Sequence, residues 1–515
     1  MPDLSQVQPT AFNCQGGLVL NRSTFMMQPG EALELQNFEP DIEGGYRRIN
    51  GFSKYVNAVV PQTSSSTEPI LMVATFGDLV VAARGEKIFS ATAGGSSWTE
   101  RDTGRTSAGT YSFERFNFDG NDKLIVVDGA NAPAVFPSNM GTPTDVGESS
   151  VDGAKFVTAF KNHMFYAGMS GKPQELVHSQ GGDEDAFSSS ATLPAGTITI
   201  DDTIVGLKTF REDLFVFCEN RIFKITGSSG SGADAFSVVP VTRKIGCING
   251  NTIQEFAGDL IFLGPDGLRT VAGTARIGDV ELGTISSNVQ SIFDENLSSA
   301  SEFQSVVIPD RSQYRIFFTK DGTGQNSTKG IVCVLKGQTF EFSELRGIKP
   351  ASTDSFVKAG DVIVLHGDFS NGYVYRQEQG NTFDGTAILA KYRSPDMTFG
   401  DAGIRKHMQR VVVNFKPESS IDADLFLRYD YESKDSARPA AYELDSQDIA
   451  AIYGTSTYGA SSSVVGTYGG ASQPLFRQSV EGSGFAVALR VNDGGETAPY
   501  SLKGFQLEYQ VGARR

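Results

Sequence analysis

The chain has 515 residues, of which 39% are hydrophobic and 10% aromatic, and its formal net charge is −16 at pH 7. The length exceeds one ordinary domain, and the apolar content is sufficient for a sizeable core. The acidic balance and the lack of a long basic block exclude a protein that grips duplex DNA through its phosphates. No apolar run approaches the roughly 18 residues of a membrane span.

The N-terminus and the cysteines indicate where the chain is made. The first six residues, MPDLSQ, have no basic flank and no apolar stretch, so a secretory signal is not expected. The four cysteines lie far apart and form no C-x-x-C pair, and three of them are in or beside apolar runs. Of Cys14, Cys218, Cys247 and Cys333, the three in or beside apolar runs are therefore predicted to be buried free thiols, and the chain is predicted to be made in a reducing cytosol.

A repeat extends over residues 70–380. In each unit a polar turn precedes a run of four or five apolar, β-favouring residues, and a second turn and strand follow. The spacing of about 40 to 55 residues gives a unit three or four short strands, which form one antiparallel blade but cannot bury both faces alone. Radial stacking of such blades predicts an all-β fold with a β-propeller of about seven blades; the alternative is an irregular β-sandwich. The turns are Gly77-Asp78, Asn121-Asp122, Asn162-His163, Glu212-Asp213, Gly258-Asp259, Ser312-Gln313 and Gly360-Asp361.

The pattern changes after about residue 385. One short helix is expected before that point, over residues 286–297, with Ser287 or Asn288 as its N-cap. Beyond it the apolar runs lengthen and alternate, which indicates strands of a separate sandwich-like domain. The predicted domains are residues 1–68, an arm and strands docking on the propeller; 69–384, the propeller; and 385–515, a C-terminal β-sandwich-like domain. A Tyr-Gly segment, 453–470, is expected to form an exposed loop there, and its Tyr453, Tyr458 and Tyr468 are candidate contact residues.

No sequence motif supports catalysis. The four histidines are scattered without a metal-ligand spacing, so a surface or packing role is predicted for His163, His178, His366 and His407. Residues 93–98 match half of a sialidase Asp box, but Ala93 stands where the Asp belongs, so a structural turn with a packed Trp98 is predicted. A propeller glycosidase would need an acidic cluster at the central tunnel. We therefore expect a chain that is not an enzyme, with no cofactor and no metal site.

An ordered series of residues near the N-terminus points to a family. Gly16-Gly17-Leu18 is followed by QPGEA at 28–32, by Leu35-Gln36-Asn37-Phe38 and by GYRRINGF at 45–52. This series resembles the opening of the tail nozzle (tail tube B-like) proteins of short-tailed bacteriophages. Residues 401–413 and 504–515 resemble the β-domain that closes the same proteins. The resemblance spans nearly the whole chain and lies in structural motifs. The chain lacks the long insertions that the largest members have within the propeller, so its platform and tip elements are expected to be reduced.

The resemblance implies a structural subunit of a phage tail. Six copies would form a ring around an axial channel below the portal and adaptor rings, extend the conduit for genome ejection, and present surfaces to fibres or spikes. Phage DNA would pass without sequence-specific binding, which suits an acidic wall. Synthesis in the host bacterial cytoplasm, a place in the virion tail and no stable membrane insertion follow from the same resemblance.

Basic residues in these motifs are the candidate contacts of such a ring. Arg405, Lys406 and Arg410, with Arg47 and Arg48, are predicted to serve intersubunit or adaptor contacts, the alternative being solvated cations. The alternative function is a propeller-type receptor- or glycan-binding tail module, which would show aromatic and polar pockets on one propeller face.

Overall fold

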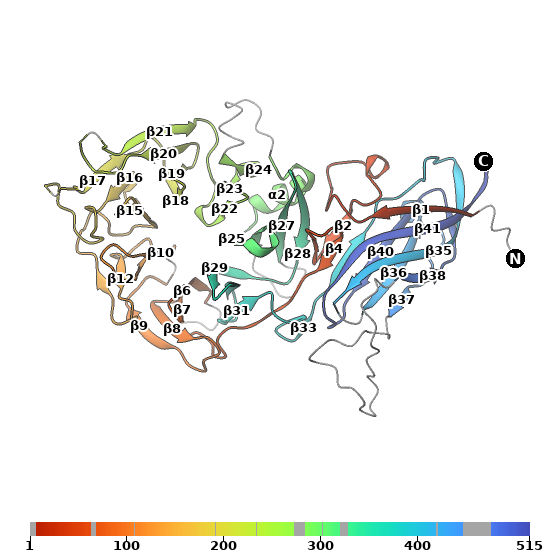
Figure 1. The fold of residues 1–515 in the computed structure, drawn as a ribbon, viewed down its shortest axis with the longest axis horizontal. Helices are drawn as coiled ribbons and strands as arrows, with labels where there is room; N and C mark the ends of the chain where they lie inside the picture. Colours follow the sequence, from red (N-terminus) through yellow and green to blue (C-terminus); the bar gives the residue numbers. More distant parts are fainter. Residues whose placement is uncertain are drawn as a thin grey trace.

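The computed structural model describes residues 7–62, 68–107, 109–190, 192–232, 234–271, 284–300, 302–319, 328–418, 421–445 and 475–514. The fold is all-β, with 52% strand and 5% helix. Figure 1 shows the sheets of a propeller, from orange through green, with the C-terminal strands in blue beside them. Among the residues that the structure describes, no helix combines the length and apolar character that crossing a membrane requires.

Four consecutive four-stranded antiparallel sheets form the first part of the propeller. The first sheet is β6 (Ile70–Phe76), β7 (Leu79–Arg84), β8 (Lys87–Thr92) and β9 (Thr99–Thr103), and the second is β10 (Ser112–Phe116), β11 (Lys123–Val127), β12 (Ala134–Phe136) and β13 (Thr144–Asp145). The third is β14 (Phe156–Phe160), β15 (His163–Met169), β16 (Lys172–His178) and β17 (Gly196–Thr199), and the fourth is β18 (Ile204–Phe210), β19 (Asp213–Cys218), β20 (Ile222–Thr226) and β21 (Ser237–Thr242).

The second part contains a smaller sheet and two groups that belong to larger sheets. The small sheet is β22 (Gln254–Phe256), β23 (Asp259–Gly264) and β24 (Gly267–Thr270), and the next group is β25 (Glu302–Ile308), β26 (Gln313–Thr319), β27 (Lys329–Lys336) and β28 (Thr339–Leu345). The last group is β29 (Pro350–Lys358), β30 (Asp361–Asp368), β31 (Val374–Gln377) and β5 (Phe52–Lys54), extended by β32 (Thr382–Phe383) and β33 (Thr386–Ala387).

The six four-stranded groups give a six-blade β-propeller arrangement. The predicted seven blades are not confirmed, because the unit at Gly258-Asp259 forms only the three strands β22–β24 within the described residues. The predicted turns do join the first and second strands of the units, and several of their residues adopt positive φ, including 59° at Gly77, 63° at Asn162 and 90° at Gly360. Glycine and asparagine tolerate this conformation, which explains why the repeat places them there.

The first strands of neighbouring sheets surround the propeller axis. Contacts join β6 to β10, β10 to β14 and β14 to β18, and on the other side β25 to β29 and β29 to β6. Apolar side chains fill the space between neighbouring sheets, as Val81 and Leu124 do between the first two. Strands such as β15 are buried along their whole length because sheets cover both faces, which explains the continuous apolar runs of the sequence.

The ring is closed by a strand from the N-terminal segment. β5 pairs antiparallel with β31, so that Phe52 lies opposite Gln377 and Lys54 opposite Tyr375. The last group contacts the first sheet through β29 and β6. The two ends of the propeller are therefore held together by backbone pairing between residues more than 300 positions apart in the chain.

The C-terminal strands form two sheets together with N-terminal strands. The strands are β1 (Val7–Asn13), β2 (Glu34–Gln36), β3 (Phe38–Pro40), β4 (Tyr46–Arg48), β34 (Ala390–Arg393), β35 (Ile404–Pro417), β36 (Asp422–Tyr429), β37 (Tyr442–Asp445), β38 (Leu475–Ser479), β39 (Ser483–Gly484), β40 (Val487–Asp493) and β41 (Tyr500–Arg514). One sheet has the order β3-β4-β41-β35-β38, with β1 also on β41 and β39 on β35. The other has the order β25-β26-β27-β28-β2-β34-β40-β36-β37, so it begins in the propeller and ends in the C-terminal strands.

A single apolar core spans the propeller side and the C-terminal side. It includes Tyr314 of β26 together with Phe415, Leu425 and Leu489 of the C-terminal strands. Because β2 joins β28 to β34, the two parts share one nine-stranded sheet. The prediction of a separate sandwich-like domain is therefore not confirmed.

The helical segments are short. The predicted helix at 286–297 is present as η4 (Ser287–Val289) followed by α2 (Gln290–Leu297), but neither Ser287 nor Asn288 caps α2, whose N-cap position is Val289. The remaining described 3-10 turns are η2 (Thr24–Met26), η3 (Gly250–Thr252), η5 (Pro309–Arg311) and η7 (Asp430–Glu432).

Candidate functional site

The N-terminal series of residues forms one local structure where the propeller meets the C-terminal sheets. Tyr46 on β4 is fully buried, its hydroxyl donates a hydrogen bond to the Gly30 carbonyl at 2.6 Å, and it accepts one from the Gly17 amide at 3.0 Å. Burial raises the pKa of Tyr46 well above its usual value, so the hydroxyl keeps the proton that it donates. One side chain thus holds three stretches of the N-terminal series together.

Glycines of this series lie where the backbone of another segment approaches closely. A Cβ atom on Gly30 would lie 2.0 Å from the Asn13 carbonyl oxygen, and one on Gly51 would lie 1.9 Å from the Thr382 carbonyl oxygen. Real Cβ atoms do not come this close to an oxygen, so both positions require glycine. Gly51 immediately precedes β5, and its lack of a side chain allows the ring-closing strand to lie against the segment that contains β32.

Asn37 connects the two halves of the nine-stranded sheet. It is fully buried with φ of 53°, and its amide donates to the Glu344 carbonyl at 2.9 Å. Its side-chain oxygen accepts from the Arg346 amide at 2.8 Å, while its side-chain nitrogen donates to the Leu389 carbonyl at 2.9 Å. Asparagine suits this position because it tolerates positive φ and offers both a donor and an acceptor.

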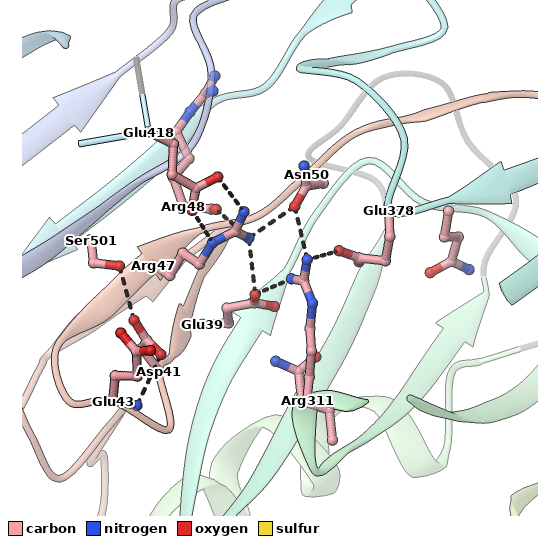
Figure 2. Close-up of polar contacts among 12 residues, drawn as sticks. Glu39, Asp41, Glu43, Arg47, Arg48, Asn50, Arg311, Glu378, Glu418 and Ser501 are labelled. Atoms are coloured by element: carbon pink, nitrogen blue, oxygen red, sulfur yellow. Dashed lines mark hydrogen bonds and ion pairs between the residues drawn. The ribbon is translucent and has the colours of Figure 1, made fainter. Parts of the chain in front are cut away.

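A group of charges, two of them buried and three partly exposed, lies next to this backbone structure, and we call it the joint cluster: Glu39, Arg47, Arg311, Arg315 and Glu378. Glu39 on β3, only 2% exposed, pairs with Arg311 and, at 3.1 Å, with Arg315. Glu378 pairs with the same two arginines at 2.8 and 2.6 Å. Figure 2 shows Arg47 and Arg311 converging on Glu39 and on the side chain of Asn50. The cluster joins the N-terminal strand β3 to two of the four-stranded groups of the propeller.

Arg47 extends the joint cluster to the C-terminal strands. Its guanidinium contacts both carboxylate oxygens of Glu418, at 2.7 and 2.9 Å, and lies 3.4 Å from Glu39. The Asn50 side-chain oxygen accepts from both Arg47 and Arg311 at 2.9 Å. A two-point arginine–carboxylate contact fixes orientation as well as distance. The joint cluster therefore links all three regions of the chain.

The charges of the joint cluster stabilise one another. Burial alone would raise the pKa of Glu39, but the charges of Arg311, Arg315 and Arg47 more than offset that effect and hold its pKa below the usual value. The pKa of Arg311 is raised, since Glu39 and Glu378 outweigh the effect of its burial. Glu39 is therefore ionised at neutral pH, and removing it would leave Glu378 as the remaining partner of both Arg311 and Arg315.

Arg48 points to the opposite side of β4 from Arg47. Its side chain is fully buried, pairs with Asp493 at 3.2 Å, and donates to the carbonyls of Thr497 at 2.7 Å and Gly495 at 2.6 Å. Successive strand residues face opposite sides of a sheet, which explains why adjacent arginines have such different surroundings. Arg48 has no surface with which to touch a second protein, so its predicted role as an assembly contact does not hold.

The other predicted basic contacts also differ in exposure. Lys406 is 2% exposed and donates to the carbonyls of Asp401 and Phe485, so it too has no surface for a partner. Arg405 is half-buried, contacts the Ser483 hydroxyl at 3.2 Å and lies over the ring of Phe485. Arg410 is 48% exposed and lies 3.5 Å from Glu508 on the neighbouring strand. Arg410 is the most accessible of the five.

Several further predictions can be placed. All four cysteines are buried and free, which confirms the prediction made for three of them. His163, His178 and His366 are buried in packing positions, whereas His407 is exposed. Trp98 packs beside a turn and donates to the Ala58 carbonyl at 2.9 Å, which confirms a structural role. Tyr453, Tyr458 and Tyr468 lie outside the described residues.

The sequence predictions missed most of the joint cluster. Glu39 lies 272 positions from Arg311 and 276 from Arg315, so no local pattern brings these residues together. Within the described ranges, no group of three or more His, Cys, Asp or Glu side chains is arranged to hold a metal ion. The joint cluster consists of ion pairs and hydrogen bonds that connect β3, the propeller and the C-terminal strands.

No protein-family model matches the chain, and no curated protein matches its sequence. Similar solved structures include the WD40 domain of Neurospora crassa Pan2, with 8% identity, a TM-score of 0.40, and coverage of 64% of this chain and 96% of that one. The WD40 β-propeller domain of Doa1 is similar at 10% identity and a TM-score of 0.37, covering 64% and 96%. The computationally designed Ika8 protein is similar at 9% identity and a TM-score of 0.35, covering 64% and 100%. These likenesses carry no inference about function.

Proposed function

We propose that this chain is a structural subunit of a bacteriophage tail nozzle, one of six copies in a ring that extends the DNA ejection channel below the portal and adaptor complex. The observation that carries the proposal is the position of the residues that resemble nozzle proteins. Gly17, Gly30, Asn37, Tyr46 and Arg47 all brace the region where the propeller meets the C-terminal sheets. In this proposal, the N-terminal series fixes the propeller relative to the C-terminal sheets, as the wall of a conduit requires.

The charge of the chain supports the proposal. Six copies would carry about −96. Acidic groups facing a bore repel the phosphates of a passing duplex, so DNA is not held there. The subunit would be made in the host cytoplasm and reside in the virion tail, with the adaptor and the tail fibres or spikes as its partners.

We further propose two refinements of the architecture. The three-stranded sheet β22–β24 acts as a reduced seventh blade, because β22 contacts β25 and η3 contacts β18 and β25. The C-terminal strands act as a sandwich-like unit, since β35 and β41 on one sheet and β36 and β40 on the other contribute to the same core. In a nozzle, this unit is the rigid platform on which the propeller is mounted.

Assembly tests the proposal directly. Negative-stain microscopy of the purified chain mixed with the adaptor ring of the same tail is expected to show six-fold rings. Arg410→Glu, at an exposed position, is expected to impair ring formation, while Arg221→Glu, on a propeller strand connection with 39% side-chain exposure, serves as the matched control. Persistent monomers in the presence of the adaptor would contradict the nozzle proposal.

A further inference from the structure

A cavity lies at the axis of the propeller, away from the joint cluster. It has a volume of about 700 Å³ and is lined by residues of five first strands, β10, β18, β22, β25 and β29. A second cavity of about 520 Å³ shares Phe113 and Thr353 with it, so the two follow one another along the axis. Ligand sites in proteins commonly occupy about 300 to 1,000 Å³. The first cavity is therefore large enough for a small ligand of two or three rings.

The wall of the first cavity is fixed by a buried carboxylate. Asp354 of β29 is 8% exposed and accepts hydrogen bonds from the amide of Thr75 at 2.9 Å and from its hydroxyl at 3.0 Å. Arg115 of β10 pairs with the same carboxylate oxygen of Asp354. Three first strands, β29, β6 and β10, thus meet at one ion pair. Asp354 and Arg115 neutralise one another and hold this side of the cavity in place.

Two charged side chains of the cavity remain available. Among the described residues, no carboxylate lies within 4.0 Å of the Lys208 ammonium, which is half-buried on β18. Glu114 on β10 accepts hydrogen bonds from the Thr158 hydroxyl, at 3.2 Å, and from the Ala159 backbone amide, and a carboxylate has lone pairs for further donors. Burial raises the pKa of Glu114, and the charge of Lys208 offsets part of that rise. The cavity therefore offers an unpaired donor group on β18 and, on β10, a carboxylate that can accept a further hydrogen bond.

The signs of these charges limit the class of ligand. An anionic ligand would be attracted by the Lys208 ammonium but repelled by the carboxylates of Glu114 and the exposed Glu255. A polyamine would be attracted by the carboxylates but repelled by the positive charges of Lys208 and Arg115. A hydroxyl group both donates and accepts, so it satisfies an ammonium and a carboxylate at once. A neutral polyhydroxylated ligand matches this lining best.

The rest of the lining fits the same class of ligand. Phe113 and Phe256 lie on the wall together with Val306 and Leu335. Such apolar side chains cover the C–H faces of a sugar ring, while the charged groups hydrogen bond to its hydroxyls. We propose that the axial cavity of the propeller binds a neutral oligosaccharide of two or three rings, held between Lys208 and Glu114 on one side and Phe113 and Phe256 on the other.

Saturation-transfer NMR of the purified full chain tests this proposal. The probes are neutral di- and trisaccharides of glucose, galactose, mannose and rhamnose, an oligosaccharide of uronic acids, and spermidine. A neutral saccharide is expected to show transfer, and the uronic acid oligomer and spermidine are not. Absence of transfer to every neutral saccharide would overturn the proposal, as would equal transfer to the charged probes.

Substitutions locate the binding to the cavity. Lys208→Met removes a group without an ion-pair partner among the described residues, so the fold should be retained, and Glu114→Gln keeps the size of the side chain. Each substitution is expected to weaken binding and so raise the dissociation constant of the saccharide about tenfold. Lys224→Met, in the same sheet but paired with Asp213 outside the cavity, should leave it unchanged. An unchanged affinity in both cavity variants would overturn the proposal. Binding is measured on the chain whether or not it forms rings, so a failed nozzle proposal and a failed cavity proposal remain distinguishable.

Discussion

The hydroxyl of Tyr46 lies 2.6 Å from the carbonyl oxygen of Gly30, in a region from which water is excluded. The two residues belong to different stretches of the N-terminal series, and the hydrogen bond between them holds those stretches against the C-terminal sheets. The series is thus held together by contacts within the chain.

The first prediction concerns this hydrogen bond. Tyr46→Phe keeps the ring but leaves the Gly17 amide without its partner and the Gly30 carbonyl with only the Gln15 amide as a donor. Leaving buried polar groups unpaired costs about 1–3 kcal/mol each, so the free energy of unfolding should fall by roughly that amount or more. Urea unfolding followed by fluorescence measures it. Tyr431→Phe, at a side chain that is 53% exposed, is the control and should change stability by less than about 0.5 kcal/mol.

The second prediction concerns the joint cluster. Glu39→Gln leaves Arg311 and Arg315 buried with only Glu378 between them. Removing one partner of a buried ion pair costs about 3–5 kcal/mol. Glu212→Gln removes an exposed ion pair with Lys161, in which the Glu212 side chain is 84% exposed. This control should lower the free energy of unfolding by less than about 1 kcal/mol. Equal effects of the two substitutions on the free energy of unfolding would show that the joint cluster has no structural role.

The third prediction concerns acid sensitivity. Burial lowers the pKa of His178 to about 4 and that of His366 to about 3, against an ordinary value near 6.5. Below pH 6.5 the unfolded chain therefore binds protons that the folded chain does not, and stability falls as the pH falls from 6.5 toward 4. The slope is about 1.4 kcal/mol per pH unit for each histidine. Above pH 6.5 neither histidine contributes to the pH dependence.

A substitution isolates one of these histidines. Neither ring nitrogen of His366 has a hydrogen-bond partner among the described residues, and the ring packs against both Phe52 and Tyr375. His366→Phe should keep the packing and reduce the slope of stability against pH between 4 and 6.5 by about 1.4 kcal/mol per unit. Unfolding curves at several pH values measure the slope. If the slope of the variant equals that of the parent chain, His366 is not the source of the acid sensitivity.

The fourth prediction concerns closure of the ring. In Gly51→Ala, a methyl group would have to displace the backbone at Thr382, and β5 would lose its position beside β31. Overpacking of this kind costs about 1–3 kcal/mol, and hydrogen exchange should accelerate in β31 and β5 before it does in β15. Gly147→Ala is the matched control, since a Cβ there meets no atom within 4 Å. Equal protection of β31 in both variants would contradict this account of closure.

The turns and strands of the propeller were predictable because they depend on neighbours in the sequence. Positive φ at Gly77, Asn162 and Gly360 follows from residue types that tolerate it, and continuous apolar runs follow from burial on both faces. The number of blades was not predictable, because the unit at Gly258-Asp259 has the same turn and apolar run as the others but forms fewer described strands.

The candidate site depended on contacts that no local pattern contains. Glu39 meets Arg311 across 272 positions of the chain, and β2 pairs with β28 and β34, which lie about 300 positions or more further along the sequence. Arg47 and Arg48 are adjacent, yet one reaches the joint cluster and the other pairs with Asp493 in the interior. Sequence alone does not reveal which face of a strand is covered, so it predicts the same contact role for both arginines.

The central claim, that this chain is a subunit of a tail nozzle, is tested most directly by negative-stain microscopy of the full chain with its adaptor ring. The account predicts six-fold rings stacked on the adaptor, each with an open axial channel. Monomers that remain unattached to the adaptor, or rings of a different symmetry, would contradict it.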